Sequence, residues 1–479
     1  MTRSEFQAIY DQGADACYAL FEATVAQMQA AIDALAARMA ELEARLSKDS
    51  HNSSKPPSSD ALSRKPKSLR PKGDKPTGGQ KGHPGTTLCW SNQPDEILGH
   101  APSVCAGCGQ CLDAVVPESC ERRQVYDLPP MRLRVTEHRA LAKLCPACGC
   151  LTHGAFPEGV TQPVQYGPGV RALCVYLQIN HLLPFERTQQ ILSDLFGASL
   201  SEGSLANFLA SCHQRLEGVE AAIKMAIPQA PVAHFDETGA RIDKKLHWLH
   251  VAATESLTYY APHARRGRPA LEAVGILPAF GGTAVHDAWA SYLAYDCAHA
   301  LCNAHLLREL AFLKEQMRQP WAEQAIALLC DIKKAVEAAK TAGAERLDPL
   351  ARLRFRARYQ WVVQEGMRAN PPAQPPFKRG RPKQSAARNL LDRMDRYRCC
   401  VLAFMDDFAV PFDNNLAERD LRMVKVQQKV SGCFRTLAGA QQFCRIRGYI
   451  STMRKQGADV LAALRSAFQG QPLVPALQG

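Results

Sequence analysis

Residues 232–242 read VAHFDETGARI, a short apolar and β-branched run that carries two adjacent acids. A run of this kind, bounded by turn residues, predicts a β-strand. Three similar runs follow at residues 246–254 (LHWLHVAAT), 256–264 (SLTYYAPHA) and 282–292 (GTAVHDAWASY), and a helical pattern, PALEAVGIL, precedes the last of them. Strands followed by mixed helices predict an α/β sheet packed with helices.

Helical patterns lie on both sides of the strand region. Residues 161–229 predict helices, and the turn at residues 197–200, followed by a candidate N-cap at Ser201, is similar to a helix-turn-helix. The second helix of such a motif enters a DNA major groove, but a helical hairpin packed in a core has the same pattern. Residues 305–408 predict long helices, and residues 409–479 predict a basic helical end.

The N-terminal 48 residues predict a coiled-coil oligomerisation helix. Apolar residues recur there at alternating steps of three and four, which is the a/d pattern of a heptad seam. An amphipathic helix packed on its own protein is the alternative. The seam consists of Tyr18, Phe21, Val25, Met28, Ile32, Leu35, Met39, Leu42 and Leu46.

Residues 49–98 predict a basic, disordered linker. Lysine, arginine, proline, glycine and serine dominate this segment up to residue 85, so it cannot bury a core. Such a segment can follow DNA phosphates without reading sequence, or it can serve as a solvated spacer.

The charge and the cysteines restrict the class of protein. A net charge of +12 favours a polyanionic partner such as nucleic acid. We expect a cytosolic protein, because the chain starts without a signal-peptide pattern and contains no apolar run long enough to span a membrane. In that compartment disulfides are disfavoured, so clustered cysteines among the 18 indicate metal binding.

Two Cys-x-x-Cys pairs within residues 99–160 predict a zinc ribbon. Cys105 and Cys108 form the first pair and Cys145 and Cys148 the second, each followed directly by glycine. Four thiolates around one ion fit a structural Zn²⁺ site, which has no open position for catalysis. Redox pairs are the rival interpretation, and the neighbouring cysteines could be alternative ligands: Cys111, Cys120 and Cys150.

Three acids have the positions expected of metal ligands. Asp236 and Asp287 each follow an apolar run, and we expect both at strand ends, whereas Glu418 follows Asp413 and Asn414, either of which could cap a helix. Carboxylates that converge from different elements can hold the divalent ions used in phosphodiester transfer. Taken singly, each acid is more often structural.

Several other polar residues near these acids could take part. Glu237 and Asp296 are the rival acids, but neighbouring residues of a strand face opposite ways, so only one of Asp236 and Glu237 can join the cluster. Cys302 and His305 have a metal-ligand spacing, for which we favour a structural strand-to-helix role next to the active site.

Basic residues follow Glu418. Arg422, Lys425 and Lys429 share its helical face, and with Arg435 they are the best candidates for phosphate contact, although a surface ion-pair ladder has the same pattern. The sequence RGRP occurs at residues 266–269 and 379–382; it is similar to minor-groove arginine hooks, but an exposed loop is the simpler interpretation.

Four motifs in this order resemble the transposases of the insertion-sequence-66 family. The upstream coiled coil, the segments NSSKPPSSD and GGQKGHPG, and the paired Cys-x-x-Cys motifs agree with the same family. The four motifs are HFDETG (234–239), VHDAWASY (285–292), HALCNAHLLREL (299–310) and FDNNLAERDLRMVKVQQKVSGCFR (412–435).

The resemblance implies a DDE transposase with a ribonuclease-H-like catalytic core. The core would occupy residues 230–304 and 409–479 around a helical insertion, with residues 161–229 as a DNA-binding region. Asp236, Asp287 and Glu418 would be the three acids and would hold two Mg²⁺ ions.

The implied activity is cleavage at the element ends and strand transfer into target DNA. The implied partners are the terminal inverted repeats, target DNA, further copies of the chain and accessory transposon proteins, in the nucleoid of a bacterial cell. A nuclease of the same fold, and a catalytically inactive or domesticated zinc-containing DNA-binding protein, are the rival functions.

Overall fold

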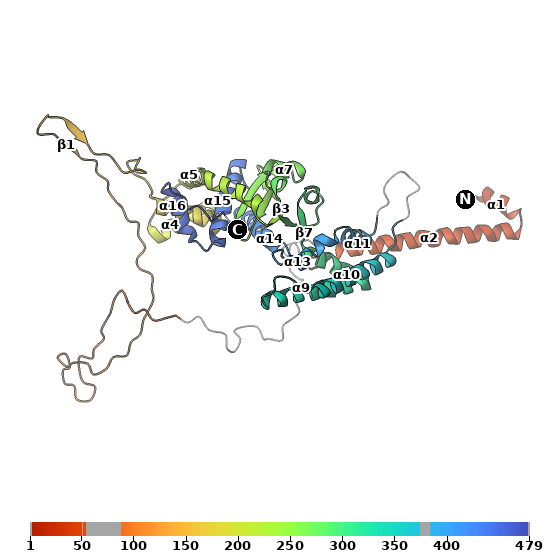
Figure 1. Cartoon of the computed structure of the whole chain (residues 1–479), viewed down its shortest axis with the longest axis horizontal. Coiled ribbons are helices and arrows are strands. Elements are labelled where there is room, and N and C mark those ends of the chain that lie inside the picture. The colour runs from red at the N-terminus through yellow and green to blue at the C-terminus, as the bar shows by residue number, and fades with distance from the viewer. Residues whose placement is uncertain (1, 50, 54–87, 374–383, 478–479) are drawn as a thin grey trace.

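The structure is a computed structural model that describes residues 2–49, 51–53, 88–373 and 384–477 (Figure 1). Most of the predicted basic linker, together with the second RGRP sequence at residues 379–382, lies outside the described residues. Within the described part of the chain, no helix combines the length and the apolar character that a membrane span needs.

A five-stranded mixed sheet forms the centre of the molecule. The strands are β3 (Val232–Ile242), β4 (Lys245–Ala253), β5 (Thr258–His263), β6 (Thr283–His286) and β7 (Ala298–Leu301), in the order β5-β4-β3-β6-β7. The first three strands are antiparallel, whereas β6 and β7 run parallel to β3. All four predicted strand regions are therefore confirmed, and the helix predicted between two of them is α7 (Arg268–Val274).

The β3–β4 hairpin turns through Asp243 and Lys244, which both have positive φ angles of 48° and 62°. Positive φ at both central residues is the geometry of the two-residue hairpin turn that matches strand twist. The turn fixes the long β3–β4 register, in which Asp236 lies opposite Val251.

Helices that precede and follow the strands in the chain share one hydrophobic core with this sheet. They are α3 (Pro168–Val175), the π-helical segment η2 (Tyr176–Asn180), α4 (Phe185–Phe196), α5 (Glu202–Arg215), α6 (Glu217–Ala226), α15 (Leu437–Lys455) and α16 (Val460–Phe468). As predicted, Ser201 caps α5, because its Oγ accepts the Ser204 backbone N–H at 3.1 Å. Leu205 and Cys212 of α5 are buried in the same core as the sheet, so residues 161–229 do not form a separate core.

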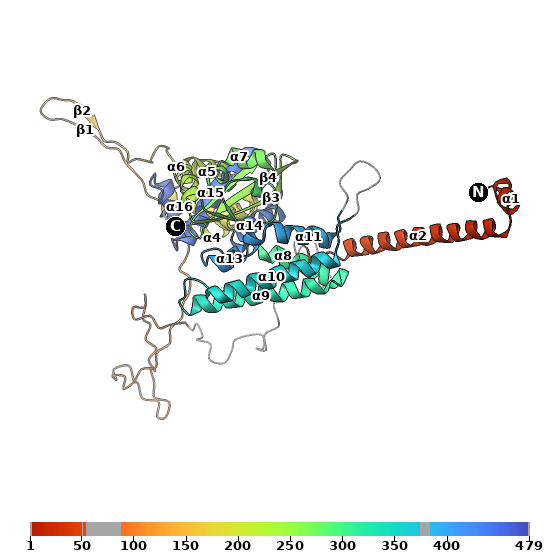
Figure 2. The same cartoon turned by 45° about the vertical axis from the view of Figure 1, so that its right-hand side comes forward.

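A second hydrophobic core lies in the helices between β7 and the last part of the sheet domain. The helices are α8 (Asn303–Met317), α9 (Pro320–Thr341), α10 (Pro349–Ala369), α11 (Ala386–Arg396), α12 (Arg398–Val401) and α13 (Ala403–Asp406). Helices α9 and α10 lie side by side away from the sheet (Figure 2). Gly366 allows α10 to approach its neighbours, since a Cβ there would lie 2.5 Å from Leu391 Cδ2 and 2.9 Å from Trp321 Cδ2.

Helix α2 (Ala14–Leu46) follows the short α1 (Arg3–Tyr10) and projects away from the body of the molecule in both views (Figures 1 and 2). All nine residues of the predicted heptad seam are exposed, from 43% for Leu42 to 80% for Leu46. In the structure this seam therefore does not pack on the chain's own core, which was the alternative interpretation. The helix end meets the body where His51 Nε2 lies 2.9 Å from Glu315 Oε1 on α8.

Candidate active site

Strand register brings Asp236 and Asp287 to neighbouring positions. His234 of β3 pairs with Val285 of β6, so Asp236 and Asp287 each lie two residues further along parallel neighbours. Side chains alternate along strands, so both acids face the same side of the sheet. Asp287 follows β6 directly, as predicted, but Asp236 lies in the middle of β3 because the antiparallel pairing with β4 continues to Ile242.

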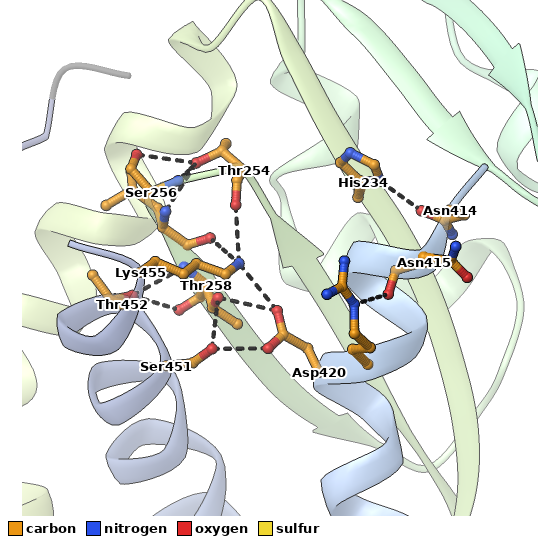
Figure 3. Close-up of polar contacts among 12 residues, drawn as sticks. His234, Thr254, Ser256, Thr258, Asn414, Asn415, Asp420, Ser451, Thr452 and Lys455 are labelled. Atoms are coloured by element: carbon orange, nitrogen blue, oxygen red, sulfur yellow. Dashed lines mark hydrogen bonds and ion pairs between the residues drawn. The ribbon is translucent and has the colours of Figure 1, made fainter. Parts of the chain in front are cut away.

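Asn414 fixes the helix that carries Glu418. This helix, α14 (Asn415–Ser431), starts beside β3, where the His234 Nδ1–H donates to Asn414 Oδ1 at 2.8 Å (Figure 3). Asn414 Nδ2 also donates to the Phe235 carbonyl at 2.9 Å. The buried Asn414 side chain therefore anchors the helix to the strand and does not cap it. At the helix start the Asp413 carboxylate accepts the Asn415 N–H at 3.1 Å.

Asp287 and Glu418 both lie close enough to Asp236 for their charges to act on it. Burial raises the pKa of Asp236 well above its usual value, and the negative charges of Glu237, Asp287 and Glu418 raise that pKa further. A group of half-buried carboxylates close to one another is unfavourable without a cation. Oxygen donors of this kind are the ligands that hard divalent ions such as Mg²⁺ prefer, so the residues fit such ions.

The rival acids have other environments. The Glu237 side chain is 1% exposed and lies 2.6 Å from Arg266 Nη2, and it also accepts a hydrogen bond from the Tyr292 hydroxyl. Arg266 in turn lies over the rings of Trp248 and Trp289, with its Cζ 4.9 and 4.3 Å from their centroids. The first RGRP sequence thus supplies a half-exposed arginine that pairs with the buried Glu237, and it is not a plain exposed loop.

Asp296 is exposed and precedes β7, away from the three acids. It therefore has no place in the cluster.

Cys302 and His305 lie beside the acids, as expected for the start of α8. The Cys302 N–H donates to the His286 carbonyl at 2.9 Å, and its Sγ lies 3.8 Å from Glu418 Oε1. His305 Nδ1 lies 3.5 Å from the same oxygen. Burial raises the pKa of Cys302 to about 12 and lowers the pKa of His305 to about 4. Both residues line a cavity of about 240 Å³ that also reaches Asp287, Trp289 and Arg393.

A second polar network holds α14 against α15 and β5 (Figure 3). Asp420 accepts hydrogen bonds from Ser451 Oγ at 2.8 Å and Thr258 Oγ at 3.2 Å, and it forms an ion pair with Lys455 at 3.1 Å. Lys455 Nζ also donates to the Thr254 carbonyl at 2.9 Å. The sequence gives no sign of this network, because its members are far apart in the chain.

The predicted basic residues lie on or after α14. Arg422, Lys425, Lys429 and Arg435 are all exposed. Lys425 Nζ donates to the Gly239 carbonyl of β3 at 2.7 Å, and burial lowers its pKa. Arg435 follows Phe434, which bridges to Ile242 at the end of β3. Lys425 and Arg435 therefore lie beside the later part of β3, beyond the acid on that strand.

Each Cys-x-x-Cys pair folds into a tight turn. The Gly109 N–H donates to the Cys105 carbonyl at 2.9 Å, and the Gly149 N–H donates to the Cys145 carbonyl at 2.8 Å. Both glycines have positive φ angles of 75° and 69°, a conformation that favours glycine. Backbone N–H groups of Cys108 and Gly107 lower the pKa of Cys105, and those of Cys148 and Ala147 lower the pKa of Cys145.

The second turn is flanked by the strands β1 (Ala142–Leu144) and β2 (Leu151–His153). Among the residues that the structure describes, the two pairs do not meet as a group of three metal-ligating side chains.

Comparison with known families agrees with this architecture. A family model described as Transposase IS66 family matches residues 163–442, and one described as the zinc-finger binding domain of transposase IS66 matches residues 102–149. A family of unknown function, DUF6444, matches residues 12–88. No curated protein matches the chain. The zinc-finger match supports a structural Zn²⁺ in the cysteine module and, with the transposase match, binding to DNA.

The transposase match covers more than half of the 479 residues and includes the sheet, the inserted helices and α14. This chain is a multidomain α/β protein that belongs to the IS66 family of transposases.

Proposed function

We propose that this chain is a DDE-type transposase with a ribonuclease-H-like core, which cuts the ends of its element and joins them to target DNA. What supports the proposal is that Asp287, at the end of β6, and Glu418, on α14, both lie near enough to Asp236 of β3 to raise its pKa. The sheet order and the helices inserted between the second and third acid support it.

Asp236, Asp287 and Glu418 would hold two Mg²⁺ ions as ligands. When bound, such ions supply Lewis-acid stabilisation of the attacking and leaving oxygens of an in-line phosphodiester displacement. The carboxylates must be ionised for this role, and they act as metal ligands and not as nucleophiles. Asn414 is a positioning residue, since its bonds to His234 and Phe235 hold the start of α14 against β3.

DNA would lie along α14, with its phosphates near Arg422, Lys425, Lys429 and Arg435. Exposed cations in this row can replace the counterions of DNA phosphates without reading the bases. Helices α4 and α5 are proposed as a further DNA-binding element, because they meet at a short turn like a helix-turn-helix.

A strand-transfer assay tests the function. Duplexes that carry the inverted repeats flanking the reading frame are incubated with Mg²⁺ and a target plasmid. Joined products support a transposase, cut but unjoined ends indicate a nuclease, and binding without cleavage indicates an inactive DNA-binding protein.

Zinc is expected to be held by Cys105, Cys108, Cys145 and Cys148. Cys105→Ser or Cys148→Ser should lower the zinc content by about one equivalent per chain, because structural zinc needs all four thiolates. Binding to the element ends should weaken as the module loses its fold. Mass spectrometry of metal content and gel-shift titration are the measurements.

Cys399→Ser is the matched control, since Cys399 is exposed on α12. If the zinc content is unchanged in both Cys105→Ser and Cys148→Ser, the ligands are instead other cysteines of the module, namely Cys111, Cys120 and Cys150.

The exposed seam of α2 is proposed to pair with the same seam of another copy. Ile32→Asp should weaken self-association more than a hundredfold, because a charge at a buried seam position costs about 3 kcal/mol or more. Size-exclusion chromatography with light scattering reports the assembly. Ala30→Asp, on the opposite face of the helix, is the control that should leave the assembly intact. Equal self-association of the two variants would exclude the seam as the contact between copies.

A further inference from the structure

One side-chain cluster at the site combines three different ligand chemistries. Cys302, His305 and Glu418 each offer an atom within 4.8 Å of the other two, and no other such trio occurs among the described residues. A thiol is not among the ligands that Mg²⁺ prefers. The cluster therefore needs an explanation beyond the magnesium site.

The fold fixes each member of the trio. Cys302 follows β7 in register with Asp287, because its N–H bonds the carbonyl of His286. His305 lies three residues further on, in the first turn of α8, where residues i and i+3 share a face. Helix α14 supplies Glu418, and the Asn414 N–H donates to Cys302 Sγ at 3.2 Å.

One polar atom of the trio, Nδ1 of His305, lacks compensation, whereas the Cys302 sulfur accepts the Asn414 N–H and lies against Glu418. Cys302 is 3% exposed, and the buried Nδ1 of His305 has no hydrogen-bond partner. That nitrogen lies 3.5 Å from Glu418 Oε1, too far for a hydrogen bond but near enough for both atoms to reach one ion. A cation between them would give the nitrogen a partner and could bind the sulfur and the carboxylate as well.

We propose that Cys302, His305 and Glu418 form a binding site for a soft divalent cation, of which Zn²⁺ is the representative. Sulfur, imidazole nitrogen and carboxylate oxygen are the three zinc ligands of proteins, and three protein ligands leave the ion a fourth, open position. On binding, the Cys302 thiol loses its proton to solvent and a sulfur–metal bond forms. This site is separate from the cysteine module.

The site has a regulatory consequence that rests on the proposed function. An ion at the trio occupies Glu418, the third acid, which the magnesium ions also need. Zn²⁺ therefore inhibits Mg²⁺-dependent cleavage by competing for one carboxylate. The adjoining cavity, which Cys302 and His305 line, gives the ion a path to the site.

Zinc content of the full-length protein tests the site directly. Protein is dialysed against Zn²⁺ and then against metal-free buffer, and bound zinc is measured by mass spectrometry. Cys302→Ser and Glu418→Gln should each hold about one equivalent fewer than the unaltered protein. Cys330→Ser, at a half-buried cysteine of α9, should hold the full amount.

Unchanged zinc in Cys302→Ser and Glu418→Gln overturns the site. If Cys302→Ser fails to fold, as judged by circular dichroism, Glu418→Gln alone decides the matter, since its side chain is partly exposed and its shape is kept. Co²⁺ gives an independent readout: the thiolate-to-metal absorption should decrease in Cys302→Ser and not in Cys330→Ser.

Cleavage assays test the consequence. Cys302→Ser should need at least about tenfold more Zn²⁺ for half-inhibition than the unaltered protein. Equal inhibition of the two proteins contradicts the competition. Absence of any Mg²⁺-dependent cleavage would instead refute the proposed function and leave the zinc count unaffected.

Discussion

Asp236→Asn, Asp287→Asn and Glu418→Gln should each reduce cleavage of the element ends by at least about a thousandfold, while DNA binding stays nearly unchanged. Each substitution removes one negative charge from a cluster whose proposed role is to hold divalent ions. Metal-based charge stabilisation contributes several kcal/mol to the transition state, and about 4 kcal/mol corresponds to a thousandfold in rate. Cleavage of a labelled end under single-turnover conditions, with a gel-shift titration beside it, measures both quantities.

Asp296→Asn is the matched control for these three variants. Asp296 is an exposed acid in the same region and lies away from the cluster, so its substitution should leave cleavage within about twofold. Cleavage that survives in Asp236→Asn, or a loss of DNA binding equal to the loss of cleavage in all three variants, would refute the assignment of the acids.

The unaltered protein separates the transposase from its rivals, and the metal-ligand variants then assign the residues. In a nuclease the same substitutions abolish cutting, but the unaltered protein forms no joined product. In an inactive DNA-binding protein the unaltered chain already fails to cut. The three outcomes differ in the unaltered protein alone, so the variants serve to assign residues and not to choose the class.

Local patterns in the sequence were enough for four of the five strands and for one acid. Residues 232–242 predict a strand with the bounds that β3 has, and Asp287 follows its strand as expected. Asp236 is different: it lies inside β3, because pairing with β4 extends the strand beyond the point where β6 stops. Strand length depends on partners far along the chain, which periodicity does not report.

The supports of the site could not be predicted, because they are contacts between distant residues. Nothing in the sequence links Asn414 to His234 or Arg266 to Glu237. Alternation along the strand did correctly separate Glu237 from Asp236. The spacing of Cys302 and His305 was visible, but their approach to Glu418 depends on how α14 returns to the sheet after the inserted helices.

Asp420→Ala should destabilise the sheet domain by about 3–5 kcal/mol, because it leaves the Lys455 ammonium buried without its ion-pair partner. The two side chains are only 11% and 16% exposed, so solvent cannot replace the lost carboxylate. Ser451 and Thr258 lose an acceptor as well. Urea unfolding followed by tryptophan fluorescence reports the core, since Trp248 and Trp289 lie beside the site.

Removing both charges provides the decisive comparison. In Asp420→Ala combined with Lys455→Met no buried charge is left alone, so the double variant should lose less stability than the sum of the single variants by about 1–3 kcal/mol. Glu255→Ala, at an exposed acid in the turn between β4 and β5, is the surface control and should change stability by less than about 0.5 kcal/mol. Strict additivity of the two single changes would mean that the Asp420–Lys455 pair does not hold α14 and α15 together.

Asp420 lies on the same helix, α14, as Glu418, but it supports the helix and does not take part in the proposed chemistry. The folded fraction of Asp420→Ala should therefore still cleave DNA far better than Glu418→Gln, whose substitution lies in the first turn of that helix.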